Sequence, residues 1–214
     1  QMMGLKPVCI SYQRKDVYSR DCEQAEKTCE IMGWEFHKVI IPTEDPKEVF
    51  KNLTYGYGVI KKTELEVLYP FLFLLDKVEE LGFTKVVCGF NPSPDNRKHA
   101  VWNRKNSKEF WDYIVNNNIT SSGSKKTVSV AKERGIIVCC PMQGHDFKNT
   151  LFGLSDKDMN KPYNKSFYKQ CFSTEFEQVG MMKVKQEPLQ KGGGMTEFFE
   201  PIIHDKEINF KNYQ

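Results

Sequence analysis

The chain alternates between short apolar segments and amphipathic segments, and this alternation is the strongest constraint on its fold. Four segments are typical of strands, at residues 6–13, 35–41, 84–89 and 135–140. The third is short and apolar, which predicts a strand buried on both faces. Segments with helical period separate the strands. Repeated strand–helix units of this kind predict an α/β fold with a doubly wound parallel sheet.

Capping residues place several helix ends. Ser19 is expected to cap a helix over residues 20–32, and Gly33 is expected to end it. Thr63 begins a sequence with capping-box spacing, which predicts a helix from there to about Leu81. Pro70 lies inside that helix and is expected to kink or divide it.

The alternation ends near residue 144, which defines the expected domain organisation. Residues 1–144 are predicted to form the parallel α/β core, and residues 145–214 a helical C-terminal extension of the same domain. The first four residues are typical of a helix end, with Gly4 at the residue after the cap. We therefore expect that the first strand–helix unit of the core lies upstream of Gln1 or is absent. Three consecutive glycines at 192–194 predict a mobile loop.

Composition limits the partners and the compartment. The net charge of +3 and pI near 8.4 are too mild to indicate nucleic-acid binding alone. No apolar run approaches the roughly 18 residues of a membrane span, so no membrane partner is expected. Seven cysteines occur without a CxxC pair, which argues against a zinc site. Reduced thiols of this kind predict a cytoplasmic protein.

Ligands of parallel sheets bind beyond the carboxyl ends of the strands, which here means the loops at 11–21, 89–104 and 141–146. Gly89 begins the second loop and would let a ligand approach the backbone closely. Asp95 in the same loop could hold Mg²⁺ near phosphate oxygens. The alternative is an ordinary proline-rich turn with a solvated aspartate.

Other polar residues are weaker candidates on spacing alone. His99 and His145 lie in these loops and could contact substrate, although no histidine has metal-ligand spacing. Lys165 could neutralise a phosphoryl or adenylate transition state, but a single lysine is more often a solvated surface charge. A basic cluster beside the second loop could meet phosphate or tRNA, or form a solvated face; it contains Arg97, Lys98, Arg104 and Lys105.

A series of motifs, in a consistent order over most of residues 5–200, resembles one known family. The motifs are Asp21-(x3)-Ala25-(x7)-Gly33, Glu35-Phe36-His37 with Val39-Ile40-Ile41, Pro70 to Leu75 with Gly82 and Val86 to Gly89, Ala131-(x3)-Gly135 to Pro141, Leu154 to Lys165, and Lys183 to Gly194. This order resembles the asparagine-synthetase-type domain of the ATP pyrophosphatase family, also described as adenine nucleotide alpha hydrolase-like or PP-loop proteins.

The resemblance implies a nucleotide-binding core that uses ATP and Mg²⁺. A substrate carboxylate or carbonyl would attack the α-phosphate of ATP, release pyrophosphate and then react with an amine, as in a C–N ligase. Lys165 would stabilise negative charge on the intermediate. Cys9, Ile10 and Ser11, taken to lie at a strand end, would line the adenine pocket. Gly89 would lie against the ribose or α-phosphate, and Asp95 would serve the metal.

The chain also departs from the family pattern. The family's SGGxDS phosphate loop does not occur in residues 1–214 of this chain, and it would precede Gln1 if it is present. The acidic loop of the family is usually G-E-G-x-D-E, whereas this chain has G-F-N-P-S-P-D from Gly89 to Asp95. No glutaminase segment is evident, so ammonia would come free or from a separate chain. Two rival functions remain: a tRNA- or nucleobase-modifying PP-loop ATPase, and a degenerate domain that binds a nucleotide or partner without catalysis.

Overall fold

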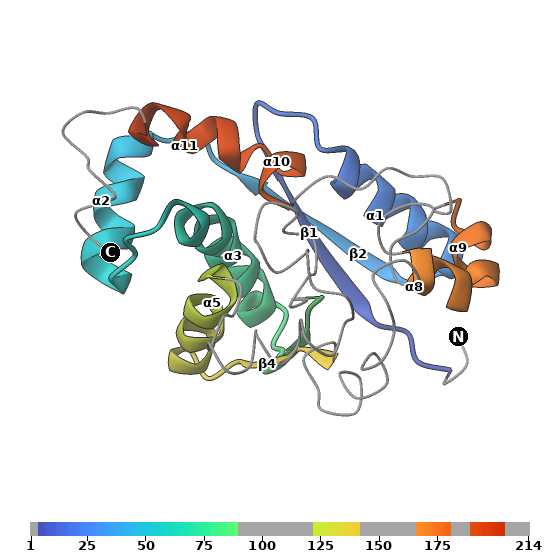
Figure 1. The fold of residues 1–214 in the computed structure, drawn as a ribbon. Coiled ribbons are helices and arrows are strands. Elements are labelled where there is room, and N and C mark those ends of the chain that lie inside the picture. The colour runs from blue at the N-terminus through green and yellow to red at the C-terminus, as the bar shows by residue number, and fades with distance from the viewer. Residues whose placement is uncertain (1–3, 90–121, 142–165, 181–188, 204–214) are drawn as a thin grey trace, which may run out of the picture. The chain divides into compact units, whose positions relative to one another are not determined.

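The computed structural model describes residues 4–89, 122–141, 166–180 and 189–203 (Figure 1). The chain divides into two compact units. The first contains residues 1–84, 122–137 and 185–214, and the second contains residues 85–121 and 138–184. The described elements are helices and short strands, so the predicted mixed α/β class is confirmed.

The first unit begins with a strand–helix–strand repeat. Strand β1 (Val8–Arg14) and strand β2 (Glu35–Ile41) pair in parallel, with Val8 opposite Glu35 and Arg14 opposite Ile41. Helix α1 (Arg20–Met32) connects them. The Ser19 Oγ accepts a hydrogen bond of 3.2 Å from the backbone N–H of Cys22. Gly33 ends the helix at φ 65°, a left-handed conformation that suits glycine. Both predicted caps are confirmed.

Helices cover both faces of the β1–β2 pair, because alternate side chains of a strand point to opposite faces. Cys9 and Ser11 lie beside Cys29 and Cys22 of α1. Tyr12 and Arg14 point the other way, toward α3 (Lys62–Glu80) and the pair α10 (Leu189–Gly192) and α11 (Met195–Ile203). The pair is therefore the centre of a three-layer arrangement within the first unit.

Helix α3 organises the rest of the first unit. It packs against both strands and against α2 (Pro46–Tyr57), α5 (Ser122–Glu133), α10 and α11 (Figure 1). The buried core includes Leu65, Leu68 and Leu75 of α3 and Phe199 and Ile202 of α11. Arg134, just after α5, forms ion pairs with Asp76 and Glu79 of α3. These contacts link α3 to the end of α5 through residues that are more than 50 positions apart in the chain.

One prediction about α3 is corrected, and one alternative of another is excluded. The helix begins at Lys62, and Lys61 occupies the cap position without a side-chain hydrogen bond, so the capping box predicted at Thr63 is wrong. Pro70 lies inside a continuous helix and does not divide it. Proline removes one backbone hydrogen bond, but its ring is fully buried here among apolar neighbours. Burial of a long apolar face therefore outweighs the local preference of one residue.

Two short strands form a second pair. Strand β3 (Lys85–Val87) lies beside β4 (Ile137–Cys139); the sequence predicted both strands, although each is shorter than expected. Two backbone hydrogen bonds connect them, from Ile137 N–H to Thr84 O (2.9 Å) and from Cys88 N–H to Cys139 O (3.0 Å). Residue numbers increase in the same direction along both strands from the first bond to the second, so the strands run parallel. The expected burial on both faces is wrong, because Val87 is 77% exposed. No described helix covers that face.

The described parts of the C-terminal region, residues 166–180 and 189–203, are helical, and they belong to different compact units. The second unit contains α8 (Ser166–Cys171) and α9 (Ser173–Gln178), which pack together. The described strands form two separate pairs, so a complete doubly wound sheet is not seen. Among the described helices, none is long and apolar enough to cross a membrane.

The glycine turn, residues 192–194, is closely packed, which corrects the prediction of a mobile loop. A Cβ atom on Gly192 would overlap the Asp21 carboxylate, and one on Gly193 would overlap the Tyr12 ring. On Gly194, which has φ 73°, it would lie 3.1 Å from Cγ1 of Val17. Glycine is required here because the backbone touches the β1–α1 segment.

We expect Gly193→Ala to lower the free energy of unfolding by about 1–3 kcal/mol, because the added methyl group has no room beside Tyr12. Urea denaturation measures the change. Gly56→Ala is the matched control, since Gly56 lies in α2 and nothing lies within 4 Å of its Cβ position. This control should be neutral or stabilise by up to about 1 kcal/mol. Equal behaviour of the two variants would contradict the close packing.

Candidate functional site

The carboxyl end of β1 gathers the densest group of buried polar side chains in the described part of the first unit. Tyr12 is 7% exposed and lies against Gly193. Burial raises the pKa of its hydroxyl, and the negative charges of Asp21 and Glu66 raise it further. Tyr12 therefore stays neutral at physiological pH and can act only as a hydrogen-bonding group.

Arg14, the last residue of β1, forms a clamp with Asp16, Gly194 and Phe198. Its Nη1 donates a 2.9 Å hydrogen bond to the Gly194 carbonyl, and its Nε donates a 2.8 Å bond to Asp16 Oδ1. A second bond from Nη2 to Asp16 Oδ2 completes a bidentate pair. The guanidinium carbon lies 5.2 Å from the centroid of the Phe198 ring. The Arg14 clamp holds the glycine turn in place.

The same contacts decide what Arg14 can do chemically. Hydrogen bonding from Arg14 lowers the pKa of the Asp16 carboxyl, so the pair remains ionised at neutral pH. The charge of Arg14 is neutralised, its side chain is buried, and three of its nitrogens already donate to protein oxygens. Arg14 is therefore a structural residue, although an arginine at this strand end would suit a phosphate.

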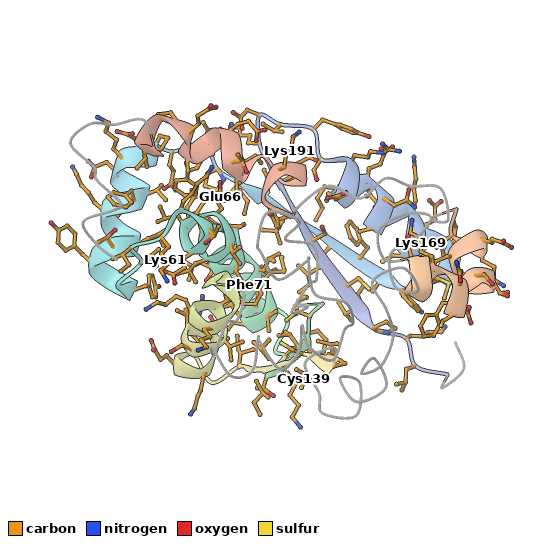
Figure 2. All side chains as sticks on the ribbon, in the orientation of Figure 1. Lys61, Glu66, Phe71, Cys139, Lys169 and Lys191 are labelled. Atoms are coloured by element: carbon orange, nitrogen blue, oxygen red, sulfur yellow. The ribbon has the colours of Figure 1, made fainter. Side chains whose placement is uncertain are left out.

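Glu66 is a buried carboxylate on α3, on the side of the helix that meets α11 (Figure 2). Only 4% of the residue is exposed, and burial raises the pKa of its carboxyl. Lys62 Nζ lies 3.5 Å from Oε1 and opposes this rise. Within the described part of the chain, Oε1 accepts no hydrogen bond. The charge is thus only partly compensated.

An aromatic group packs beside these polar residues. Tyr69 stacks on Phe198 with ring centroids 5.4 Å apart, and meets Phe199 edge to face at 5.8 Å. Burial raises the pKa of the Tyr69 hydroxyl, and Glu44 adds to the rise. Aromatic packing of this kind stabilises the junction of α3 and α11. The whole group is therefore a solid packed region and not an open pocket.

The sequence-predicted contacts on β1 occupy different surroundings. Cys9, Ile10 and Ser11 lie in the first half of the strand, so their predicted place at its end is wrong; β1 continues to Arg14. Cys9 and Ser11 point toward α1, whereas Ile10 points to the opposite face. The structure therefore does not bring the three side chains into one pocket. Any contact that they share with a ligand would come from the main chain.

The other predicted site residues are less constrained. Gly89 follows β3 by two residues, and no atom of the described residues lies within 4 Å of its Cβ position. Asp95, His99, His145 and Lys165 lie outside the described residues. In the ranges that are described, no three acidic, histidine or cysteine side chains group as metal ligands. The roles proposed for these residues, and the Mg²⁺ site, stay predictions.

Sequence reasoning missed Arg14 and Glu66. A signal existed for Glu66, because it is one acid within the otherwise apolar run from Leu65 to Leu75. Such a residue is either functional or held by a partner. Arg14 carried no comparable signal, since its partner Gly194 lies 180 residues away.

Comparison with known proteins adds no relative. No protein-family model matches the chain, and no curated protein matches it either. The likeness to the ATP pyrophosphatase family therefore rests on the motifs and their order.

We expect Arg14→Lys to lower the free energy of unfolding by about 1–3 kcal/mol, because lysine cannot make the Asp16 and Gly194 bonds together. Chemical denaturation gives the value. Arg20→Lys, at an exposed position that begins α1, is the control and should change stability by less than about 0.5 kcal/mol. Equal losses in both variants would show that the clamp contributes nothing.

Glu66→Gln tests the buried carboxyl through pH. A raised folded-state pKa means that the folded protein holds this proton more firmly than the unfolded chain. The wild type should therefore lose stability as pH rises from the unfolded value of 4.5 through the folded value. Glutamine removes this loss, so the variant should have the higher melting temperature at neutral pH and a flatter pH profile.

Melting temperatures of the wild type and of Glu66→Gln are measured from pH 4 to pH 8, in steps of roughly one pH unit. A pKa difference of one unit between the folded and unfolded protein changes the free energy of unfolding by about 1.4 kcal/mol. Glu30→Gln is the control, because Glu30 is exposed on α1. Its profile should follow that of the wild type. A variant at position 66 that melts lower than the wild type at neutral pH would indicate that the Lys62 ion pair outweighs the burial of the charge.

Proposed function

We propose that this chain is an ATP-dependent adenylating domain that prepares a C–N bond. A substrate carboxylate or carbonyl oxygen attacks the α-phosphate of ATP, and pyrophosphate leaves. An amine then attacks the activated carbon and displaces AMP. The protein's role in this scheme is to position the reactants and to stabilise charge, not to transfer protons.

The observation that carries the proposal is the parallel β1–α1–β2 unit and the motif residues on it. Asp21 and Ala25 lie on α1, and Gly33 ends that helix. The segment Val39–Ile41 lies on β2, which pairs in parallel with β1. These are the positions that the family resemblance requires of them, and nucleotide-binding α/β proteins are built from such units.

Residues in the loops that follow the strands would carry out most of the adenylation chemistry. Gly89 follows β3, and among the described residues no atom lies within 4 Å of its Cβ position; a glycine there would allow close approach of a ribose or phosphate. Asp95 would bind Mg²⁺ on the phosphates, and Lys165 would stabilise the negative charge that develops on the adenylate. His99 and His145 would contact the acceptor. Main-chain groups of Cys9, Ile10 and Ser11 would meet the adenine.

A second candidate function is modification of tRNA or a nucleobase by the same adenylation chemistry. The basic residues Arg97, Lys98, Arg104 and Lys105 beside the Gly89 loop favour it. A nucleic-acid substrate would make the reaction strongly dependent on salt, whereas a small carboxylate would not.

ATP–pyrophosphate exchange across a panel of carboxylates and amines tests the proposal. We expect carboxylate-dependent exchange that falls by at least about 100-fold in Lys165→Ala, because one preorganised charge contributes this much to a transition state. Lys132→Ala, at an exposed position on α5, is the control and should retain full exchange.

Each rival gives a distinct result in this assay. Exchange that requires tRNA and weakens steeply with salt would favour the modifying enzyme. ATP binding without exchange would favour the degenerate binding domain. Normal exchange in Lys165→Ala would overturn the role assigned to that lysine, while unchanged circular dichroism of the variant excludes unfolding as the cause of a loss.

A further inference from the structure

The register of β3 and β4 places two cysteines side by side. The backbone N–H of Cys88 donates to the carbonyl of Cys139. In a parallel ladder, a residue that donates to the carbonyl of Cys139 lies beside the residue that follows Cys139. Cys88 therefore lies beside Cys140, and both side chains are on the same face of the strand pair. Cys139 then points to the opposite face together with Val87. The exposures agree, because Val87 and Cys139 are exposed while Cys88 and Cys140 are half-buried.

The two sulfur atoms are close enough to bond after a small movement. Cys88 Sγ and Cys140 Sγ lie 3.7 Å apart, so they need to approach by roughly 1.7 Å to reach the S–S length of about 2.05 Å. Neighbouring strands are spaced by about 4.8 Å, within the Cα separation of roughly 4.4–6.8 Å that disulfides span. Each cysteine also lies one residue beyond its strand, where the backbone is freer to adjust.

We propose that Cys88 and Cys140 are a dithiol that glutathione disulfide, or another small disulfide, converts to an intramolecular disulfide. One protein thiolate attacks the small disulfide, forms a mixed disulfide and releases one thiol. The second protein thiolate attacks the protein sulfur of that bond and releases the other thiol. The two protein thiols lose two electrons and two protons in total, and the small disulfide gains them.

The bond would join the segments that follow β3 and β4. Cys88 directly precedes Gly89, and Cys140 directly precedes Pro141, so oxidation would fix the first residues of two loops relative to each other. Reduction would release them. The proposal rests on the strand register and the sulfur distance, and it does not depend on the adenylation function.

Mass spectrometry after incubation in glutathione redox buffers tests it. Quenched and alkylated protein is digested with trypsin, which cleaves after Lys85 and Arg97 and after Arg134 and Lys148. We expect a linked pair of peptides, 86–97 with 135–148. Fragmentation between the adjacent cysteines of the second peptide identifies the bonded sulfur without any substitution. The Cys140 link should exceed the Cys139 link by more than about tenfold, because only Cys140 has the required geometry.

Variants give an independent check. Cys140→Ser should abolish the linked pair, whereas Cys139→Ser, one residue away and on the exposed face, should retain it. Cys171→Ser controls for the exposed thiol on α8 and should have no effect. Each variant is first shown to be folded by near-ultraviolet circular dichroism. A link that survives Cys140→Ser, or a wild type that gives only glutathione adducts, would overturn the proposal.

Discussion

The strict alternation of side chains along β1 is the constraint on which the first unit depends. Alternate residues face α1, where Cys9 and Ser11 meet two cysteines of that helix. The intervening residues face α3 and the C-terminal helices, where Tyr12 and Arg14 contact the glycine turn. One short strand therefore joins segments from both ends of the chain. The Arg14 clamp fixes this junction with a bond that spans 180 residues.

This arrangement changes where ligand chemistry can lie. The carboxyl end of a parallel strand is the usual ligand site, yet at β1 the protein's own glycine turn occupies it. Tyr12, Arg14 and Glu66 are buried there and are engaged in packing or partial charge compensation. Side-chain chemistry at this end of β1 is therefore limited to packing and structural hydrogen bonds. Gly89 and the Cys88–Cys140 pair lie at the start of the loops after β3 and β4.

Local signals predicted local structure well. Ser19 and Gly33 set the limits of α1 because a side-chain cap and a left-handed glycine act within one helical turn. Thr63 misled for the opposite reason, since α3 is held by burial of a long apolar face, tolerates a poor cap and continues through Pro70. For the candidate site, the sequence nominated loops and strand residues, while the contacts of Arg14 with Gly194 and Phe198 depended on a distant segment.

The sequence by itself determined the limits of α1 and the alternation of strands and helices in the first part of the chain, because these follow from capping and periodicity. Only the tertiary structure decided that residues 192–194 form a close-packed turn. It also decided that Arg14 is a clamp and that Cys88 lies beside Cys140 and not beside Cys139. Each of these depends on strand register or on contact between segments that are remote in the chain. The spacing of residues within one segment predicts neither.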